Sequence, residues 1–493
     1  MSPKVPAPLS ASPKNVLQRK PTKPPSKLRW VWLALSLIGV ATVSASAGAL
    51  LAVAIAGTPL LQSKLTPEEA EVFNQDEPIS TSLSLRMPQL TRPVNILILG
   101  VKVLSSDVSN PPPEAQNLGY HATINSLEGL SDTMMLVRFN PEMRQLTVLS
   151  LPRDTRTWID GLGLTKLNEA NTYGGPALAA RATNELLGGV GIDRYIRINV
   201  QGVEKLIDAL GGVTVYVPQD MQYKDDSQHL YINLKQGEQH LNGAQALQFL
   251  RFRYDNYGDI GRIQRQQMFM GALKEQALSP SILTKLPQIL SAVQSNLDTN
   301  LSVEELLALA GFASQVDRSN VRMLMLPGDF SYAEEYEASY WLPNQRKIDE
   351  ITQQYFGRET VSYVSADYAE TTKIAIQDST GQPNAVQHWV QTLDTIGYGN
   401  VFVDLPWSER LATTRIIAQQ GDVRTAEAIR QSLGFGEVLI ESTGSLDSDI
   451  TIQLGQDALQ VHPVPDPTAI DSPEVAEPAL QPDAIPDQST AIP

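Results

Sequence analysis

The chain has 493 residues, of which 42% are hydrophobic, so it can build a sizeable core and divide into two or three domains. Its formal net charge of −16 becomes about −23 after the first 29 residues (31 basic against 54 acidic side chains), which excludes nucleic-acid binding through bulk charge. The chain has no cysteine, which excludes disulfides, thiol nucleophiles and thiolate metal sites, and its five scattered histidines form no zinc-binding pair.

The first 60 residues have the layout of a membrane anchor. Residues 1–29 are rich in Pro, Lys and Ser, with seven basic side chains and no acid, and we expect a disordered cytoplasmic tail. Residues 30–57 carry no charged side chain and exceed the about 20 residues that cross a bilayer. The basic flank predicts that the N-terminus stays inside and that the rest of the chain lies outside the cytoplasm, in a periplasm if there is an outer membrane. A cleaved signal peptide ending near Ala45-Ser46-Ala47 is the alternative, but the long leader and the apolar sequence beyond it favour a retained single-pass helix in the cytoplasmic (inner) membrane.

A linker with at most one short helix is expected over 58–92, followed by an αβ domain over 93–315. The apolar run at 95–100 is typical of a buried strand, and 133–139 with 145–151 read as a hairpin. The Pro/Ser/Asn-rich stretch at about 103–128 reads as a loop. The domain is completed by helices at 176–187 and 203–210, strands at 195–199 and 213–217, segments 244–251 and 262–278, and helical sequence through about 280–315.

We expect a linker region over 316–371 and a second, smaller domain over 372–460. In that domain the strand-like runs KIAIQD, VFVDLP and DITIQLG alternate with helical segments at 385–396 and 422–433, which indicates a compact αβ unit. The acidic tail 461–493 holds eight prolines and six acids without a base, and we expect it to be disordered.

The most informative stretch is RFRYDNYGDIGRIQRQQ, residues 251–267. Arginine presents a planar, permanently charged fork that suits phosphate oxygens, and four arginines stand here close together. The first two alternate as on one face of a strand; the other two share a helix face with Gln266, in a helix beginning after Gly258-Asp259-Ile260-Gly261. A solvated surface of Arg–Asp pairs is the alternative. The arginines concerned are Arg251, Arg253, Arg262 and Arg265.

Charged residues also cluster at the predicted strand ends, where sites in α/β domains are usually built. Ser131-Asp132-Thr133 opens one hairpin strand, and Arg153-Asp154 follows the other in LSLPRDT. KLNEANTYGG, residues 166–175, stands just before a helix. Taken singly, each motif is better explained as a turn cap, a local ion pair or loop chemistry.

In this order the motifs resemble the LytR-CpsA-Psr (LCP) family. The matching segments are NILILG, SDTMMLVRFNP, LSLPRDT, KLNEANTYGG, INVQGVEKLIDALGGVTV and LRFRYDNYGDIGRIQRQQ, and they cover roughly 93–278. Residues 372–457 resemble the LytR C-terminal domain. The resemblance implies an α-β-α sandwich with a mainly antiparallel sheet and an apolar lipid pocket. It also implies an envelope phosphotransferase that moves a glycopolymer from a polyprenyl-pyrophosphate carrier to a peptidoglycan hydroxyl.

The resemblance also assigns site residues. Asp132 would be a magnesium ligand, Asp259 the general base toward the acceptor hydroxyl, and Asp154 would orient the neighbouring arginine. Positioning and charge neutralisation are what phosphoryl transfer requires from a protein, so these residue types agree with that chemistry. The pyrophosphate clamp would comprise Arg153, Arg251, Arg253, Arg262 and Gln266, with Arg265 and Lys102 as further pyrophosphate-binding residues.

The chain departs from the family pattern beside the expected metal site. Lys102 stands where family members commonly carry an aspartate, and Leu130 where they carry an arginine. We hypothesise that the Lys102 ammonium replaces part of the positive charge that a metal ion held by two carboxylates would supply. Alternatively, Asp107 folds back and becomes the missing metal ligand. Residues at helical spacing more often form simple core than line a cavity, but the lipid would find apolar walls among Leu167, Leu178, Leu186, Leu187, Leu206, Ile207, Leu210 and Leu247.

Two other functions remain open from sequence. A hydrolase that releases the polymer from its lipid pyrophosphate would use the same residues with water as acceptor. A non-catalytic envelope protein would bind polyprenyl lipids or anchor partners through its second domain. A transcription regulator is disfavoured, because the expected topology and the acidic charge turn the soluble domains away from DNA.

Overall fold

A computed structural model describes residues 65–73, 77–81, 88–102, 127–226, 230–252, 258–278, 282–332, 334–357 and 372–461. The predicted membrane helix, both terminal tails, Asp107 and Arg253 lie outside these residues. So do the side chains of Lys102, Asp259 and Arg262, whose backbones are described. Within the described residues no helix is both long and apolar enough to cross a membrane.

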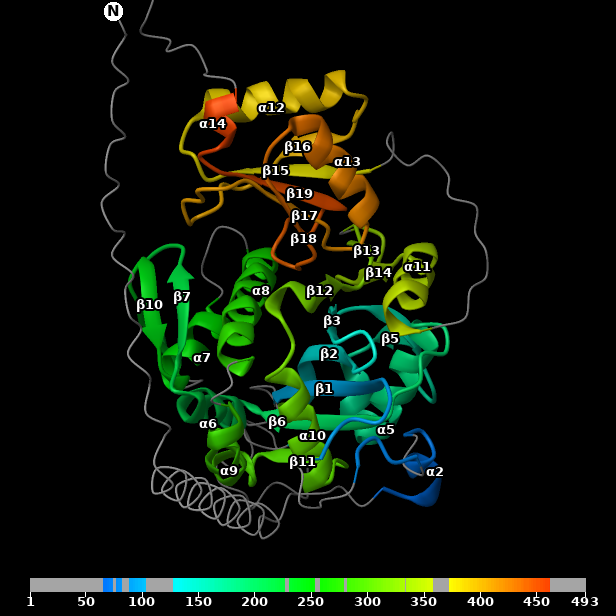
Figure 1. Cartoon of the computed structure of the whole chain (residues 1–493). Coiled ribbons are helices and arrows are strands. Elements are labelled where there is room, and N and C mark those ends of the chain that lie inside the picture. Colours follow the sequence, from blue (N-terminus) through cyan, green and yellow to red (C-terminus); the bar gives the residue numbers. More distant parts are fainter. Residues whose placement is uncertain are drawn as a thin grey trace, which may run out of the picture. The chain divides into compact units, whose positions relative to one another are not determined.

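A six-stranded mixed sheet forms the centre of the first domain (Figure 1). Three neighbouring pairs are antiparallel, β1–β2, β2–β3 and β6–β11, while β1–β6 and β3–β12 are parallel. The mainly antiparallel sheet that was expected is therefore present in its three middle strands, β1, β2 and β3, whereas the strands beside them, β6 and β12, pair in parallel. The strands in spatial order are β11 (Leu297–Thr299), β6 (Arg194–Asn199), β1 (Val94–Lys102), β2 (Leu130–Asn140), β3 (Gln145–Leu151) and β12 (Val321–Met325).

Helices cover both faces of this sheet, as the family resemblance implied. Alternation along β2 turns Met134 and Leu136 toward α5 (Glu169–Leu186), and Met135 and Val137 to the other face. On that second face Met270 of α8 (Gly258–Ala277) and Phe312 of α10 (Val303–Ala313) pack against them. The sheet is thus buried from two sides, which explains why β1 reads as a continuous apolar run.

A smaller layer beside the sheet carries the segment around the arginine motif. Its buried cluster includes Val215, Ile232 and Phe249, under the antiparallel pair of β7 with β10 and the hairpin of β8 with β9. Its elements are α6 (Val200–Leu210), β7 (Val213–Val217), β8 (Met221–Asp225), β9 (Leu230–Leu234), β10 (Gly237–Leu241), α7 (Gly243–Arg251) and α9 (Ile282–Val293).

The apolar residues expected around a lipid pocket are divided among separate cores. Leu167, Leu186 and Leu187 are buried in the cluster under α5, whereas Ile207 and Leu210 belong to clusters around α6. These five side chains are buried in cores, whereas Leu178, Leu206 and Leu247 are partly exposed, and the pocket lining stays a prediction.

The segment before β1 belongs to the first domain, although we expected a linker over 58–92. The short helix is present as α2 (Pro67–Ala70), capped by Thr66 and Glu69. Phe73 is buried with its ring 5.1 Å from that of Tyr195. Single buried apolar residues fix this segment, and they leave no periodic pattern in the sequence.

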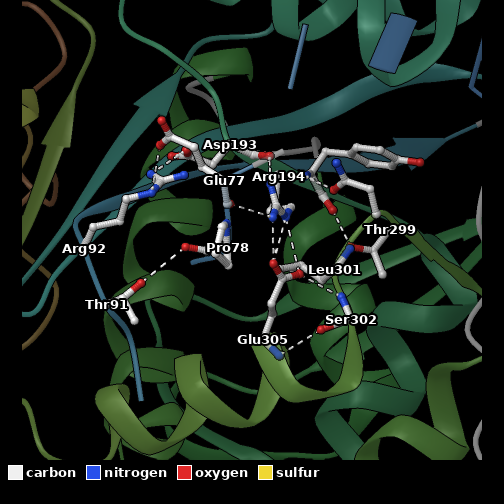
Figure 2. A network of polar contacts seen from close by, with 12 residues as sticks. Glu77, Pro78, Thr91, Arg92, Asp193, Arg194, Thr299, Leu301, Ser302 and Glu305 are labelled. Carbon is white, nitrogen blue, oxygen red and sulfur yellow. Dashed lines mark hydrogen bonds and ion pairs between the residues drawn. The ribbon is translucent and has the colours of Figure 1, made fainter. Parts of the chain in front are cut away.

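An ionic network fastens the same segment to the start of β6 (Figure 2). Arg92 donates to Asp193 at 2.7 Å and pairs with Glu77 at 3.3 Å. Arg194 donates to Glu305 of α10 at 2.7 Å, and both residues are buried. Segments more than 100 residues apart are therefore joined at this end of the sheet.

The prediction of a linker over 316–371 is wrong for residues 318–356, which form strands and helices of the first domain. β12 is the edge strand of the central sheet, and α11 packs Ile348 and Ile351 into the core under α5. The pairing partner of β12 lies 175 residues earlier in β3 (Val321 opposite Leu146), so no local pattern could reveal it. The region contains η1 (Arg318–Asn320), β12, β13 (Gly328–Phe330), β14 (Trp341–Pro343) and α11 (Gln345–Phe356).

The second domain is the compact αβ unit that the sequence predicts. Its five strands lie in the order β16-β15-β19-β17-β18, with α12 and α13 packed on the face that presents Ile374, Ile416 and Ile452. Its elements are β15 (Ile374–Asp378), α12 (Pro383–Thr395), β16 (Val401–Val403), β17 (Arg415–Ile417), α13 (Val423–Leu433), β18 (Glu437–Leu439), β19 (Ile450–Leu454) and α14 (Ala458–Val461).

This second domain covers the open edge of the central sheet. The β12 amides of Met323 and Met325 donate to the carbonyls of Ile440 and Gln419 at 2.9 and 3.0 Å. Lys274 of α8 also binds Glu441 at 2.8 Å. An edge strand with unpaired amides is a template for aggregation, so this docking protects β12.

Candidate active site

The candidate site lies at one edge of the central sheet. β1, β3, β6 and β12 run in one direction and β2 in the other, so the ends of the first four meet the start of β2 there. The hairpin register pairs Met134 with Leu151, and Asp132 and Arg153 stand two residues beyond this pair. The predicted motifs SDT and LPRDT are therefore neighbours in space.

A β-bulge sets the direction of Asp132. Gly100 pairs with Thr133 and Val101 with Ser131, so Asp132 has no opposite residue on β1. Bulges are frequent next to active sites, where they turn a side chain out of the regular pleat. A Cβ on Gly100 would stand 3.1 Å from that of Thr133, so glycine permits the close approach of the two strands here.

Four charged side chains form a chain of ion pairs at this edge. Arg153 Nη1 donates to Asp132 Oδ1 at 2.6 Å, and Arg153 Nε to Asp154 Oδ2 at 3.2 Å. Lys166 Nζ donates to Asp154 Oδ1 at 2.7 Å. Each side chain is 21–28% exposed, so the chain faces solvent while neighbouring groups hold it. Asp154 therefore contacts Arg153, and its role in orienting that arginine stays a prediction.

Sequence reasoning gave Lys166 no role, although it opens the KLNEANTYGG motif. Lys166 is the last residue of β5 (Gly163–Lys166), which pairs with β4 (Arg156–Ile159) in a hairpin. The hairpin begins two residues after Asp154, and its last residue, Lys166, binds Asp154. The amide of Asn168 donates to the Arg153 carbonyl at 3.1 Å, which closes the base of this hairpin. The signal that could have found Lys166 is its place at the end of a short strand, next to a motif already singled out.

A buried polar cluster supports the site and was not predicted. Arg197 of β6 donates to Asp298 at 2.8 Å and to Asn171 at 3.3 Å. Asn171 in turn donates to the carbonyl of Gly129 at 2.7 Å, just before β2. The NTYGG motif, expected as a loop before a helix, lies inside α5, which kinks at Gly175 with φ +61°. Asn171 thus holds the chain that leads into Asp132.

The arginine motif is only partly as predicted. Arg251 ends helix α7, not a strand, because Asn242 and Gln245 form a capping box that starts the helix. Helix α8 begins at Gly258, so Asp259 lies in its first turn. The role of Arg251 as a phosphate ligand, like those of Gln266, Arg253, Arg262 and Asp259, stays a prediction.

The prediction that Arg265 binds pyrophosphate is wrong in this structure. Arg265 is 3% exposed, and its guanidinium donates to the Phe252 carbonyl and lies 5.5 Å from the centre of the Phe252 ring. Spacing along a helix shows which residues share a face, but it does not show which face turns inward. Arg265 therefore ties α8 to the end of α7.

A divalent cation could use Asp132 at this site. Among the described residues no group of three or more Asp, Glu or His side chains comes together. Asp132 Oδ2 has no hydrogen-bond partner among those residues, while Oδ1 binds Arg153. Mg²⁺ is commonly held by one or two carboxylates with substrate phosphates and water, so one free carboxylate oxygen fits such an ion. Lys102 lies opposite Leu130, at the same end of β1.

Comparison with known proteins covers both domains. A model of the LytR_cpsA_psr family matches residues 61–356, and one described as LytR cell envelope-related transcriptional attenuator matches 371–457. The polyisoprenyl-teichoic acid–peptidoglycan teichoic acid transferase TagU of Bacillus cereus is 31% identical over 262 residues, which are 52% of this chain and 77% of TagU. TagV of Bacillus subtilis is 31% identical over 231 residues, 45% of this chain and 58% of TagV.

Solved structures of similar proteins align with about half of the chain. The crystal structure of Bacillus subtilis TagV covers 55% of this chain and 99% of its own, with 28% identity and a TM-score of 0.44. TagT bound to LI-WTA covers 54% and 89%, with 24% identity and a TM-score of 0.40.

Proposed function

This chain belongs to the LytR-CpsA-Psr family, and from this membership we propose that it transfers a glycopolymer from a polyprenyl-pyrophosphate carrier to peptidoglycan. The curated relatives named above are transferases that attach teichoic acid to peptidoglycan. The observation that carries the proposal is Arg153, held between Asp132 and Asp154 at the sheet edge where the family motifs meet.

The proposed step breaks a phosphoanhydride bond and forms a phosphoester bond. An oxygen of an acceptor hydroxyl attacks the sugar-bearing phosphorus and forms a new P–O bond. The P–O bond to the bridging oxygen breaks, and polyprenyl monophosphate leaves. The hydroxyl proton passes to the Asp259 carboxylate in the first turn of α8, and Arg153 stabilises the charge on the phosphate oxygens.

Asp154 and Lys166 position Arg153 for this role. Asp154 binds Arg153 through one oxygen and Lys166 through the other, so the Lys166 ammonium also keeps the cluster from becoming too negative for a pyrophosphate. A Mg²⁺ ion at Asp132 would supply further positive charge to the phosphate oxygens when bound.

The site would act at the outer surface of the cytoplasmic membrane. We place residues 30–57 as a single-pass anchor because they carry no charge over a length that spans a bilayer, with basic residues on the N-terminal side. Protease added to spheroplasts should then digest residues 65–461, and protection of those residues would refute this topology.

Transfer is tested by the fate of a labelled glycopolymer. Purified protein is given a lipid-linked polymer with peptidoglycan, and the label should become covalently attached to peptidoglycan. Free polymer formed equally without peptidoglycan would show a hydrolase. The absence of both products, with lipid-linked polymer still bound, would show a non-catalytic binding protein.

Dependence on a divalent cation is expected to be partial. If Lys102 supplies part of the positive charge, a chelator should lower the transfer rate by about tenfold, and Mg²⁺ should restore it. Lys102→Ala should be impaired to a similar degree in Mg²⁺ and inactive in the chelator. Rates of both proteins with and without chelator test this. Complete loss of the unsubstituted protein's activity in the chelator would show that Lys102 contributes no such charge.

A further inference from the structure

The outer face of the β4–β5 hairpin continues the surface of the active site. The hairpin starts two residues after Asp154 and ends at Lys166, the ion-pair partner of Asp154. Arg156 lies opposite Lys166, and Trp158 lies opposite Leu164. Opposed residues and every second residue of a strand share a face, so all four of these side chains stand on one side of the hairpin.

This face combines exposed apolar groups with aromatic rings that bind cations. Trp158 and Leu164 are 54% and 53% exposed, which is unusual for two large apolar side chains side by side. At the base of the hairpin the Arg156 guanidinium lies 5.0 Å from the ring centre of Tyr336, and Lys166 Nζ lies 5.6 Å from that of Tyr340. The two tyrosine rings meet edge to face at 5.4 Å.

Resting on the proposed function, we propose that this face is a saccharide-binding subsite beside the pyrophosphate. A sugar attached to a phosphate at Arg153 must extend along one wall of the site, and Lys166 joins Arg153 to this hairpin through Asp154. The apolar face of a sugar ring packs against an indole, while its hydroxyls remain in contact with charged groups. Trp158 between Leu164 and Arg156 offers both.

The charges around this face argue against a polyprenyl chain as its occupant. Asp160 in the hairpin turn pairs with Arg181 at 3.3 Å, and Arg156 and Lys166 flank the other end. An alkyl chain laid across the face would strip water from these groups without giving hydrogen bonds in return. Sugar hydroxyls can replace that water.

Direct binding of soluble saccharides tests the subsite without any transfer reaction. The full-length protein is labelled with fluorotryptophan, and the Trp158 resonance is assigned with Trp158→Phe. It is titrated with peptidoglycan oligosaccharides in one arm and with a lipid-free sugar pyrophosphate in the other. The Trp158 signal should shift in at least one arm, which also identifies acceptor or donor glycan. Trp158→Ala should weaken that binding about tenfold.

Two variants at comparable exposed positions serve as controls. Met143→Ala, on the β2–β3 turn, and Tyr231→Ala, on the β8–β9 hairpin, remove side chains 67% and 52% exposed and should leave saccharide binding unchanged. Equal binding by Trp158→Ala and the unsubstituted protein in both arms would overturn the subsite. So would a loss limited to polyprenyl phosphate without sugar, which would assign the face to lipid. Saccharide binding that needs Trp158 in a protein without transferase activity would refute the proposed function alone.

Discussion

Replacement of Arg153 by alanine is expected to lower the rate of glycopolymer transfer by about 10²–10³-fold, the cost of removing one preorganised charge from a transition state. The loss should exceed a simple charge deletion, because the Asp132 and Asp154 carboxylates would then face the substrate phosphates without the guanidinium between them. kcat/KM for attachment of labelled polymer to peptidoglycan measures the effect. The fold should tolerate the change, since partly exposed ion pairs contribute at most about 1 kcal/mol.

Three further variants separate the roles within the ion-pair chain. Arg153→Lys keeps the charge but loses the fork, so it should restore only part of the rate. Lys166→Met should reduce kcat by about tenfold. In a protein that already carries Arg153→Ala, the same substitution should reduce kcat much less, because Lys166 acts through Arg153. Arg318→Ala removes an arginine in the exposed pair with Glu275 and should have no effect. Transfer by Arg153→Ala within threefold of the unsubstituted rate would exclude this cluster as the phosphate site.

The proximity of Asp132, Arg153 and Asp154 could be predicted because it depends on a local feature. The turn after Asn140 joins two strands of matching apolar pattern, and a hairpin brings the residues beyond its open end together whatever surrounds it. The family motifs at both strand ends then predict a site there. The second domain was predictable for the same reason, since its strands and helices alternate over short distances.

What could not be predicted depends on contacts between distant segments. β12 lies beside β3, and Asp298 pairs with Arg197 across 101 residues, but neither contact leaves a pattern within one window of sequence. The prediction that Arg265 binds pyrophosphate was wrong for another reason. Its spacing placed it on a face with Gln266, while the packing of Phe252 and α8 decided that its guanidinium turns inward.

Loss of Glu305 is expected to destabilise the first domain by about 3–5 kcal/mol, because Glu305→Ala leaves the Arg194 guanidinium buried without its carboxylate. Glu305 also completes the capping box of α10, in which its Oε2 accepts from the Ser302 amide at 2.8 Å (Figure 2). Ser302→Ala should cost only the cap, about 1 kcal/mol. Glu305→Gln keeps the shape and an acceptor but not the charge, so it should lie between the two. Urea midpoints followed by tryptophan fluorescence compare these variants.

The site should survive this loss of stability, which distinguishes the two ends of the sheet. Arg194 lies opposite Ile96 on β1, four residues or about 13 Å before Gly100, where the bulge that directs Asp132 begins. Glu305→Ala assayed at low temperature should therefore transfer polymer at a rate within about threefold of the unsubstituted protein. Arg153→Ala should instead have the urea midpoint of the unsubstituted protein but fail to transfer polymer. Glu304→Ala, one residue away on α10, should cost at most about 1 kcal/mol. If Glu305→Ala unfolded no more easily than Glu304→Ala, the buried pair would not be what holds this end of the domain together.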